Sequence, residues 1–106
     1  MRVRIYQINM ERDTENIIFR NYTYATKNGV SPEIYDLKFD GDIPVQTLEG
    51  VFALFNLSRP DNFKGHSLSI SDIVEFVEGD KSECYYCDDI GWEFIKFDGT
   101  KAHKDI

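Results

Sequence analysis

Apolar residues recur along residues 47–57 with the spacing of one helix face. Four of them stand at i, i+3, i+4 and i+7, which is the stripe of an amphipathic helix: Leu48, Val51, Phe52 and Phe55. Thr47 offers a hydroxyl suited to capping the helix N-terminus, and Pro60 with its polar neighbours ends the pattern. This spacing predicts a helix over residues 47–57.

Strict alternation of apolar and polar residues predicts strands elsewhere, because successive strand side chains point to opposite faces. Residues 35–39 alternate in this way, and Asp40-Gly41-Asp42 is expected to end that strand. The last third of the chain predicts three more strands, over residues 73–77, 83–87 and 92–97. Gly79-Asp80 between the first two suits a type I′ or II′ hairpin turn, so we expect a C-terminal three-stranded meander.

The first third of the chain is less regular. Residues 2–8 are β-prone and predict a first strand. Within residues 17–27, Ile18, Tyr22 and Ala25 fit one helix face, although the aromatic and β-branched residues favour a strand. We expect a short helix there, stopped by Asn28-Gly29. The sequence from Ser31 to Glu33, with proline in the middle, is typical of a helical or 3₁₀ start.

These elements predict an α+β fold, with the 47–57 helix on one face of a mainly antiparallel sheet of about five strands. The chain has 106 residues and is 42% hydrophobic, enough for one real core. No repeat, linker or low-complexity run divides it. We therefore expect one domain over residues 1–98 and a polar, frayed tail over residues 99–106.

Charge is unevenly distributed along the chain. The net charge is −7, and residues 72–98 hold nine acids against two lysines, while residues 1–71 are close to neutral. This excess argues against a phosphate-binding face, and hence against direct nucleic acid binding. It indicates either a solvated sheet face or a surface for a basic protein partner, with three candidate residues: Glu75, Glu83 and Glu93.

Targeting signals are not evident. No stretch approaches the roughly 20 apolar residues that span a bilayer, and the arginines near the N-terminus precede no apolar run of a signal peptide. Two cysteines suit a reducing compartment. We expect a cytoplasmic protein without a membrane partner. Since edge strands can pair between chains, the oligomeric state is a monomer or a homodimer.

The segment from Gly65 to Asp72 has the densest set of reactive groups. It contains a histidine, three hydroxyls and a carboxylate: His66, Ser67, Ser69, Ser71 and Asp72. A nucleophile with its base could be drawn from them, but catalytic triads are assembled from distant parts of a chain. Ser and Asp side chains also bond nearby backbone amides and fix turns, so we expect a structural loop first and a binding loop second.

Other candidate groups favour structural roles. Cys84 and Cys87 have the C-x-x-C spacing, but on a strand they point to opposite faces, and no histidine has the spacing of a zinc site. Asp88 and Asp89 lack the further oxygens of a cation loop. We therefore expect no metal and no cofactor. Aromatic side chains could stack on bases, but their acidic surroundings favour packing: Tyr22, Tyr24, Tyr85, Tyr86 and Trp92.

The central part of the chain contains a series of short motifs. The predicted helix ends in Phe55-Asn56, and the segments Pro60–Phe63 and Gly65–Asp72 follow it, with Tyr85-Tyr86 and Asp88–Trp92 further on. This series resembles the YodL-like domain family, which has a short helix ending in Phe-Asn, a Pro-x-x-Phe segment, a Gly-His-Ser-Leu-Ser-x-Ser-Asp strand entry, a Tyr-Tyr strand and an Asp-x-x-Gly-aromatic turn. The resemblance covers roughly residues 35–97 and departs at Cys87, where the family often has an apolar residue.

The resemblance implies an accessory protein of a conjugative or integrative mobile element of Gram-positive bacteria. It also makes the matched loop residues, from His66 to Asp72, the place for a functional surface. Two functions follow as hypotheses. The first is a non-enzymatic protein-interaction module that uses the acidic C-terminal sheet. The second is a small hydrolase or nucleic-acid-processing enzyme that uses His66 with Ser67 or Asp72.

Overall fold

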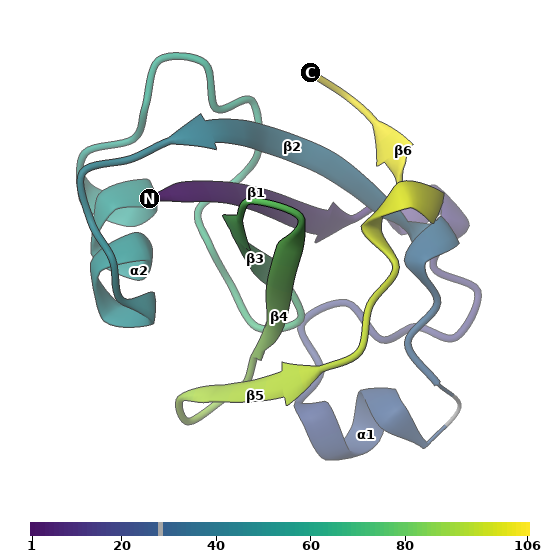
Figure 1. Cartoon of the computed structure of the whole chain (residues 1–106). Coiled ribbons are helices and arrows are strands. Elements are labelled where there is room, and N and C mark those ends of the chain that lie inside the picture. Colours follow the sequence, from purple (N-terminus) through teal and green to yellow (C-terminus); the bar gives the residue numbers. More distant parts are fainter. Residues whose placement is uncertain (28) are drawn as a thin grey trace.

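A twisted six-stranded sheet forms the centre of the computed structural model, which describes residues 1–27 and 29–106 (Figure 1). Its strands lie in the order β5-β4-β3-β1-β2-β6. They are β1 (Arg2–Ile8), β2 (Tyr35–Asp42), β3 (Ile73–Glu78), β4 (Lys81–Cys87), β5 (Trp92–Ile95) and β6 (His103–Lys104). All neighbours are antiparallel except β2 and β6. The α+β class and the mainly antiparallel sheet are confirmed, with one strand more than predicted.

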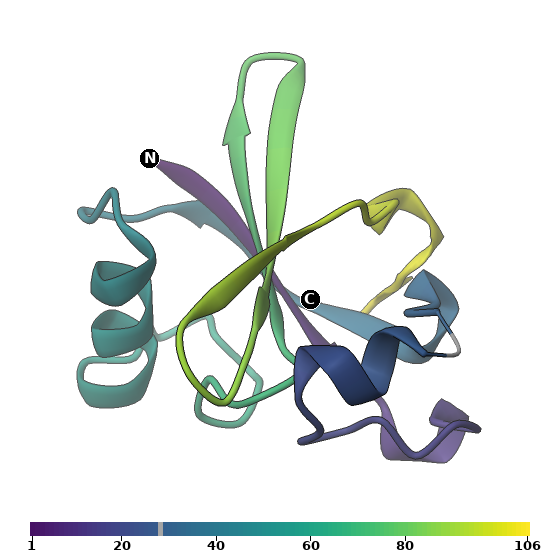
Figure 2. The same cartoon turned by 90° about the horizontal axis from the view of Figure 1, so that it is seen from below.

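Both faces of the sheet are covered. The two helices are α1 (Tyr22–Thr26) and α2 (Leu48–Leu57), and Figure 2 shows them on opposite sides of the strands. On the α2 face, Val51 and Phe55 of the helix pack on β1, β2 and β3 through Val3, Ile5, Phe39 and Val74. On the α1 face, residues of segment 17–34 pack on Tyr6, Ile8, Tyr35 and Tyr86.

A register shift lets β2 serve both cores. Ile5 opposes Phe39 and Tyr6 opposes Leu37, so that Lys38 is an extra residue on β2. Such a bulge changes the local twist and the direction of the side chains. Phe39 consequently joins the α2 core, whereas Leu37, two residues before it, joins the α1 core.

The helix predicted over residues 47–57 is confirmed. It runs from Leu48 to Leu57, and the Thr47 hydroxyl accepts the amide of Gly50 at 3.0 Å, as an N-cap does. The hairpin turn is also confirmed. Gly79 has a φ of +63°, and Asp80 is not in the left-handed region, which is the pattern of a type II′ turn.

The short helix predicted over residues 17–27 is wrong in extent. The Asp13 carboxylate accepts the amides of Ile17 and Ile18, both at 3.0 Å, and Phe19 has a φ of +64°. This tight carboxylate-held turn prevents a helix from starting, so that α1 begins only after Asn21, whose side chain caps it. Of the predicted stop, Gly29 has positive φ, while Asn28 lies outside the described residues.

The predicted end of the second strand at Asp40-Gly41-Asp42 is wrong, because β1 continues opposite it. Arg2 opposes Asp42 and Arg4 opposes Asp40. The Arg2 guanidinium donates to both oxygens of Asp40, at 2.9 and 3.0 Å. Cross-strand pairing of this kind overrides the turn preference of the Asp-Gly-Asp sequence.

The predicted frayed tail is also wrong. The strand expected to end at Phe97 ends at Ile95, and Gly99–Lys101 then forms a 3₁₀ turn over the buried Tyr6. A Cβ at position 99 would overlap the Tyr6 hydroxyl, so the close approach requires glycine. Beyond it, β6 pairs in parallel with β2, and the amide of Asp105 donates to Leu37 O at 3.1 Å.

Candidate functional site

The 65–72 loop, which leads into β3, is held to the sheet by the side chain of Gln7. Gln7 Nε2 donates to His66 O at 2.9 Å and to Asp72 Oδ2 at 3.0 Å, and Gln7 Oε1 accepts the amide of His66 at 3.1 Å. A Cβ at Gly65 would overlap Gln7 Oε1. Gly65 therefore permits the close approach by which one buried amide clamps both ends of the loop.

Two more anchors fix the same loop. Asn56 accepts the amide of Leu68 at 2.6 Å and donates to its carbonyl at 3.2 Å. Ser71, fully buried with a φ of +84°, accepts the amide of Phe19 with its hydroxyl at 3.0 Å and the hydroxyl of Tyr35 with its carbonyl at 2.7 Å. The polar groups of this segment thus satisfy backbone groups around them.

His66 is not assembled with a nucleophile or an orienting acid. Its ring is exposed, and Nδ1 lies 2.7 Å from Ser67 O, so Nδ1 carries the proton and donates to that carbonyl. Its ring edge meets Phe19, with centroids 5.9 Å apart. Among the residues that the structure describes, no carboxylate bonds the ring, and the Ser67 hydroxyl is not bonded to it. The geometry of a base-activated nucleophile is therefore missing.

Asp72 is the most unusual group of the loop. It is 1% exposed, and its Oδ2 accepts from Gln7 and from the amide of Ser69 at 2.8 Å. Within the described residues its Oδ1 has no hydrogen-bond partner. Burial raises the pKa of the Asp72 carboxyl well above its ordinary value, against the opposing effect of the two donors.

The three acids proposed as one interaction face are not brought together. Glu75 is 5% exposed on the α1 face, where it accepts from Tyr6 Oη at 2.7 Å, Ser82 Oγ at 2.6 Å and Arg4 at 3.2 Å. Glu93 opposes Tyr86 and so points to the same α1 face, whereas Glu83 opposes Phe76 and points to the α2 face. Only Glu83 and Glu93 are exposed, and they lie on opposite faces.

The α2 face of the meander instead carries a row of aromatic rings, which we call the aromatic belt: Phe52, Phe76, Tyr85, Trp92 and Phe94. Phe76, Tyr85 and Phe94 form a cross-strand ladder over β3, β4 and β5, with centroids 6.1 and 5.8 Å apart. Phe52 of α2 meets Trp92 edge-on at 6.5 Å. None of the five is buried, and Phe52 and Phe94 are 41% and 56% exposed.

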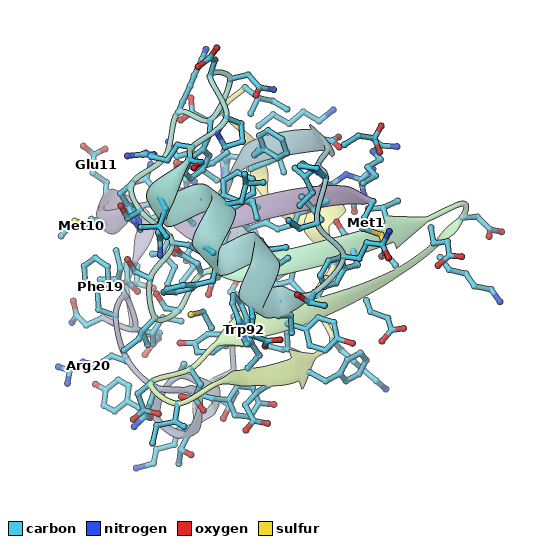
Figure 3. The ribbon with its side chains drawn as sticks, turned by 90° about the vertical axis from the view of Figure 1, so that its left-hand side faces the viewer. Met1, Met10, Glu11, Phe19, Arg20 and Trp92 are labelled. Atoms are coloured by element: carbon cyan, nitrogen blue, oxygen red, sulfur yellow. The ribbon has the colours of Figure 1, made fainter. Side chains whose placement is uncertain are left out.

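Two cavities open along the belt, and carboxylates stand at both. One of about 580 Å³ has Phe76 and Tyr85 in its wall, with Glu78 and Glu83 at its rim beside Lys81. The other, of about 330 Å³, lies between α2 and the β4–β5 turn, with Phe52 and Trp92 in its wall. Figure 3 shows Trp92 beside α2, away from Met10 and Phe19, which lie at the left edge of the molecule in this view. A half-exposed aromatic surface of this kind is typical of an interaction site.

Comparison with known proteins gave one result. A family model described as the YodL-like domain matches residues 2–97. The chain belongs to the YodL-like domain family. No curated protein and no solved structure gave a significant match. The family match stops before the Gly99–Lys101 turn and β6, which complete the sheet of this YodL-like domain at its β2 edge.

The remaining candidate groups of this YodL-like domain are structural. Cys84 and Cys87 are free, buried and on opposite faces, and burial raises the pKa of each thiol to about 12, so neither is a ready nucleophile. Asp88 Oδ1 accepts the amides of Tyr22 and Asp89, both at 2.9 Å. In residues 1–27 and 29–106, no three His, Cys, Asp or Glu side chains converge to hold a metal ion.

The two helices of residues 1–27 and 29–106 have 5 and 10 residues, and neither is long and apolar enough to cross a bilayer.

Sequence reasoning missed most of the belt. The sequence favours packing over base stacking for Tyr85 and Trp92, and it places Phe52 in the apolar stripe of the helix. The available signal is an excess of apolar residues on α2, because one helix face cannot bury all six of them: Leu48, Val51, Phe52, Leu54, Phe55 and Leu57. The structure buries only Val51 and Phe55.

Proposed function

We propose that this YodL-like domain is a non-enzymatic protein-interaction module that binds a basic protein partner on the aromatic belt. The observation that carries the proposal is the exposure of Phe52 and Phe94, one in the ring pair with Trp92 and the other in the ladder with Tyr85 and Phe76. Exposed aromatic side chains supply most of the binding energy in many interfaces, because they bury much area at little entropic cost. The belt therefore replaces the acid trio as the contact surface, and Glu83 is the member of that trio that it retains.

Charge around the belt favours a basic partner. Glu49, Glu78, Glu83 and Asp89 are exposed carboxylates at its two cavities, and Lys81 is the basic side chain among the described residues that line them. These carboxylates would repel an acidic partner and attract a basic partner to the belt. The mobile-element context implied by the family resemblance suits an adaptor of this kind, and two free buried thiols suit the cytoplasm as the place of the encounter.

Affinity capture with matched variants tests the proposal. The tagged protein is incubated with a lysate of a host that carries the element, and bound proteins are identified by mass spectrometry. We expect the native protein to capture a basic protein. The variant Phe52→Ser/Phe94→Ser should no longer capture it, and Leu57→Ser should still do so. Leu57 is the matched control because it is an apolar residue of α2, 84% exposed, outside the belt.

Charge reversal adds a second control. Glu83→Lys should weaken capture, and Glu93→Lys on the opposite face should not. A partner that the belt variant holds as firmly as the native protein contradicts the proposal. A second contradicting result is a native protein that light scattering shows to be a dimer and a Phe94→Ser variant that it shows to be a monomer. In that case a second copy of the chain would occupy the belt.

A further inference from the structure

The 330 Å³ cavity at the end of the belt has a distinct chemistry. Its wall has the rings of Phe52 and Trp92, and its rim has the carboxylates of Glu49, Asp88 and Asp89. Among the described residues that line it, none is basic. Its volume is at the lower end of the range for ligand pockets, so it has room for one long side chain rather than for a large ligand.

Two of the three rim carboxylates are held in place before any partner arrives. Asp88 Oδ1 is fixed by the first amide of α1 and by the amide of Asp89, and Asp89 Oδ1 accepts the amide of Ile90 at 2.9 Å. The Asp88 Oδ2 atom makes no bond within residues 1–27 and 29–106, and the Asp89 and Glu49 side chains are exposed. The two aspartates therefore offer carboxylate oxygens to an incoming cation at little cost of reorganisation.

The aromatic wall narrows the class of cation. Phe52 and Trp92 meet edge-on at 81°, and both rings line the cavity. A ring face attracts a cation that lies within about 6 Å of its centroid. Guanidinium is planar, weakly hydrated and able to stack on such a face while its N–H groups bond carboxylates, whereas ammonium is compact and strongly hydrated.

We propose that this cavity binds an arginine side chain of the partner, with the guanidinium against Trp92 and its N–H groups donating to Asp89 and Glu49. This rests on the proposed function, because the arginine would be the part of the basic partner that anchors it at one end of the belt. Arginine is among the residues that most often anchor an interface when its charge is paired and its plane stacked.

Trp92 makes the assignment measurable, because it is the single tryptophan of the chain. The probe is Nα-acetyl-arginine amide, titrated against the native protein and followed by tryptophan fluorescence. Nα-acetyl-citrulline amide, which has the same shape without the charge, is the matched probe. We expect a saturable change in fluorescence with the arginine probe, and an affinity for the citrulline probe that is about ten-fold lower. We also expect added salt to lower the affinity for the arginine probe.

Variants test where the probe binds. Glu49→Gln/Asp89→Asn changes two exposed rim residues and should lose the arginine response, while Glu93→Gln, next to Trp92 in sequence but on the α1 face, should keep it. No fluorescence response, an equal response to both probes, or a full response of the rim variant overturns the arginine pocket. The belt proposal fails separately, by retained capture in Phe52→Ser/Phe94→Ser, so the two failures are distinguishable.

Discussion

The burial of the 65–72 loop and of the aromatic belt is the reverse of what their compositions suggest. Polar residues of the loop are buried, and aromatic residues of the belt are exposed. Ser71 and Asp72 in the loop are 0% and 1% exposed, whereas Phe52 and Phe94 in the belt are 41% and 56% exposed. Ser71 and Asp72 can be buried because each accepts a bond from a distant segment, Ser71 Oγ from the amide of Phe19 and Asp72 Oδ2 from Gln7. The comparison teaches that burial follows the supply of partners as much as the polarity of a residue.

The belt stays exposed for a geometric reason. A helix of 10 residues is about 15 Å long, and α2 packs over β1, β2 and β3. Strands lie nearly 5 Å apart, so β4 and β5 extend beyond the helix. Of their α2-facing residues, Tyr85 and Phe94 therefore lie beyond the helix, and Trp92 meets it at Phe52.

Removal of the Gln7 side chain should give the largest loss of stability. Gln7→Ala removes three hydrogen bonds of the loop and leaves Asp72 with a single donor in a buried site. We expect the free energy of unfolding to fall by about 3 kcal/mol, measured by urea denaturation. A loss below about 1 kcal/mol would show that the loop does not depend on this clamp.

Asp72→Asn should change how stability depends on pH. Because the folded pKa is raised, the native state keeps a proton that the unfolded state releases above about pH 4, and stability falls as the pH rises towards the folded pKa. We expect the free energy of unfolding of the native protein to fall as the pH rises from about 5 towards the folded pKa, by up to about 1.4 kcal/mol per pH unit, and this slope to shrink in Asp72→Asn.

The pKa of Asp40 is shifted in the opposite direction to that of Asp72. Its hydrogen bonds with Arg2, and then the one with Arg4, lower the pKa of its carboxyl, so its contribution is present above about pH 4 and lost in acid below that value. A change of stability above about pH 5 therefore reports Asp72 rather than Asp40. Identical slopes for the native protein and Asp72→Asn would mean that Asp72 is ionised in the fold.

Phe94→Ser should have the smallest effect on stability, although it replaces a large aromatic residue. The ring is more than half exposed and touches chiefly Tyr85, so we expect a change within about 0.5 kcal/mol by urea denaturation. A cost above about 2 kcal/mol would place Phe94 in the core and would remove the contrast between the belt and the loop.

The elements that could be predicted from sequence are those specified by local pattern. The stripe of α2, the Thr47 cap and the Gly79-Asp80 turn depend on residues within one turn or hairpin of each other. The elements that could not be predicted depend on distant partners. Asp13 prevents a helix at Ile17, Arg2 and Arg4 extend β2 through Gly41, and β6 exists only because β2 offers an edge.

The candidate site divides in the same way. The structural role expected for the 65–72 loop agrees with its geometry, because Ser and Asp bond backbone amides wherever they are placed in turns. The partners Gln7 and Asn56 are remote in sequence and gave no signal. The acid trio could not be judged from sequence, since Glu75 is committed to Tyr6, Ser82 and Arg4 by the register of three strands.

The first strand of the chain is a central strand of the sheet, and this has a consequence for the order of folding. β1 can pair with β2 early, and β3, β4 and β5 can form from short hairpins, but the two halves join only where β1 meets β3. The Arg4–Glu75 pair across that seam spans 71 residues. Closure of so long a loop is entropically costly before it gains contacts, so the seam is the slow step, and the Phe76–Tyr85–Phe94 ladder can form on the meander before the core is sealed.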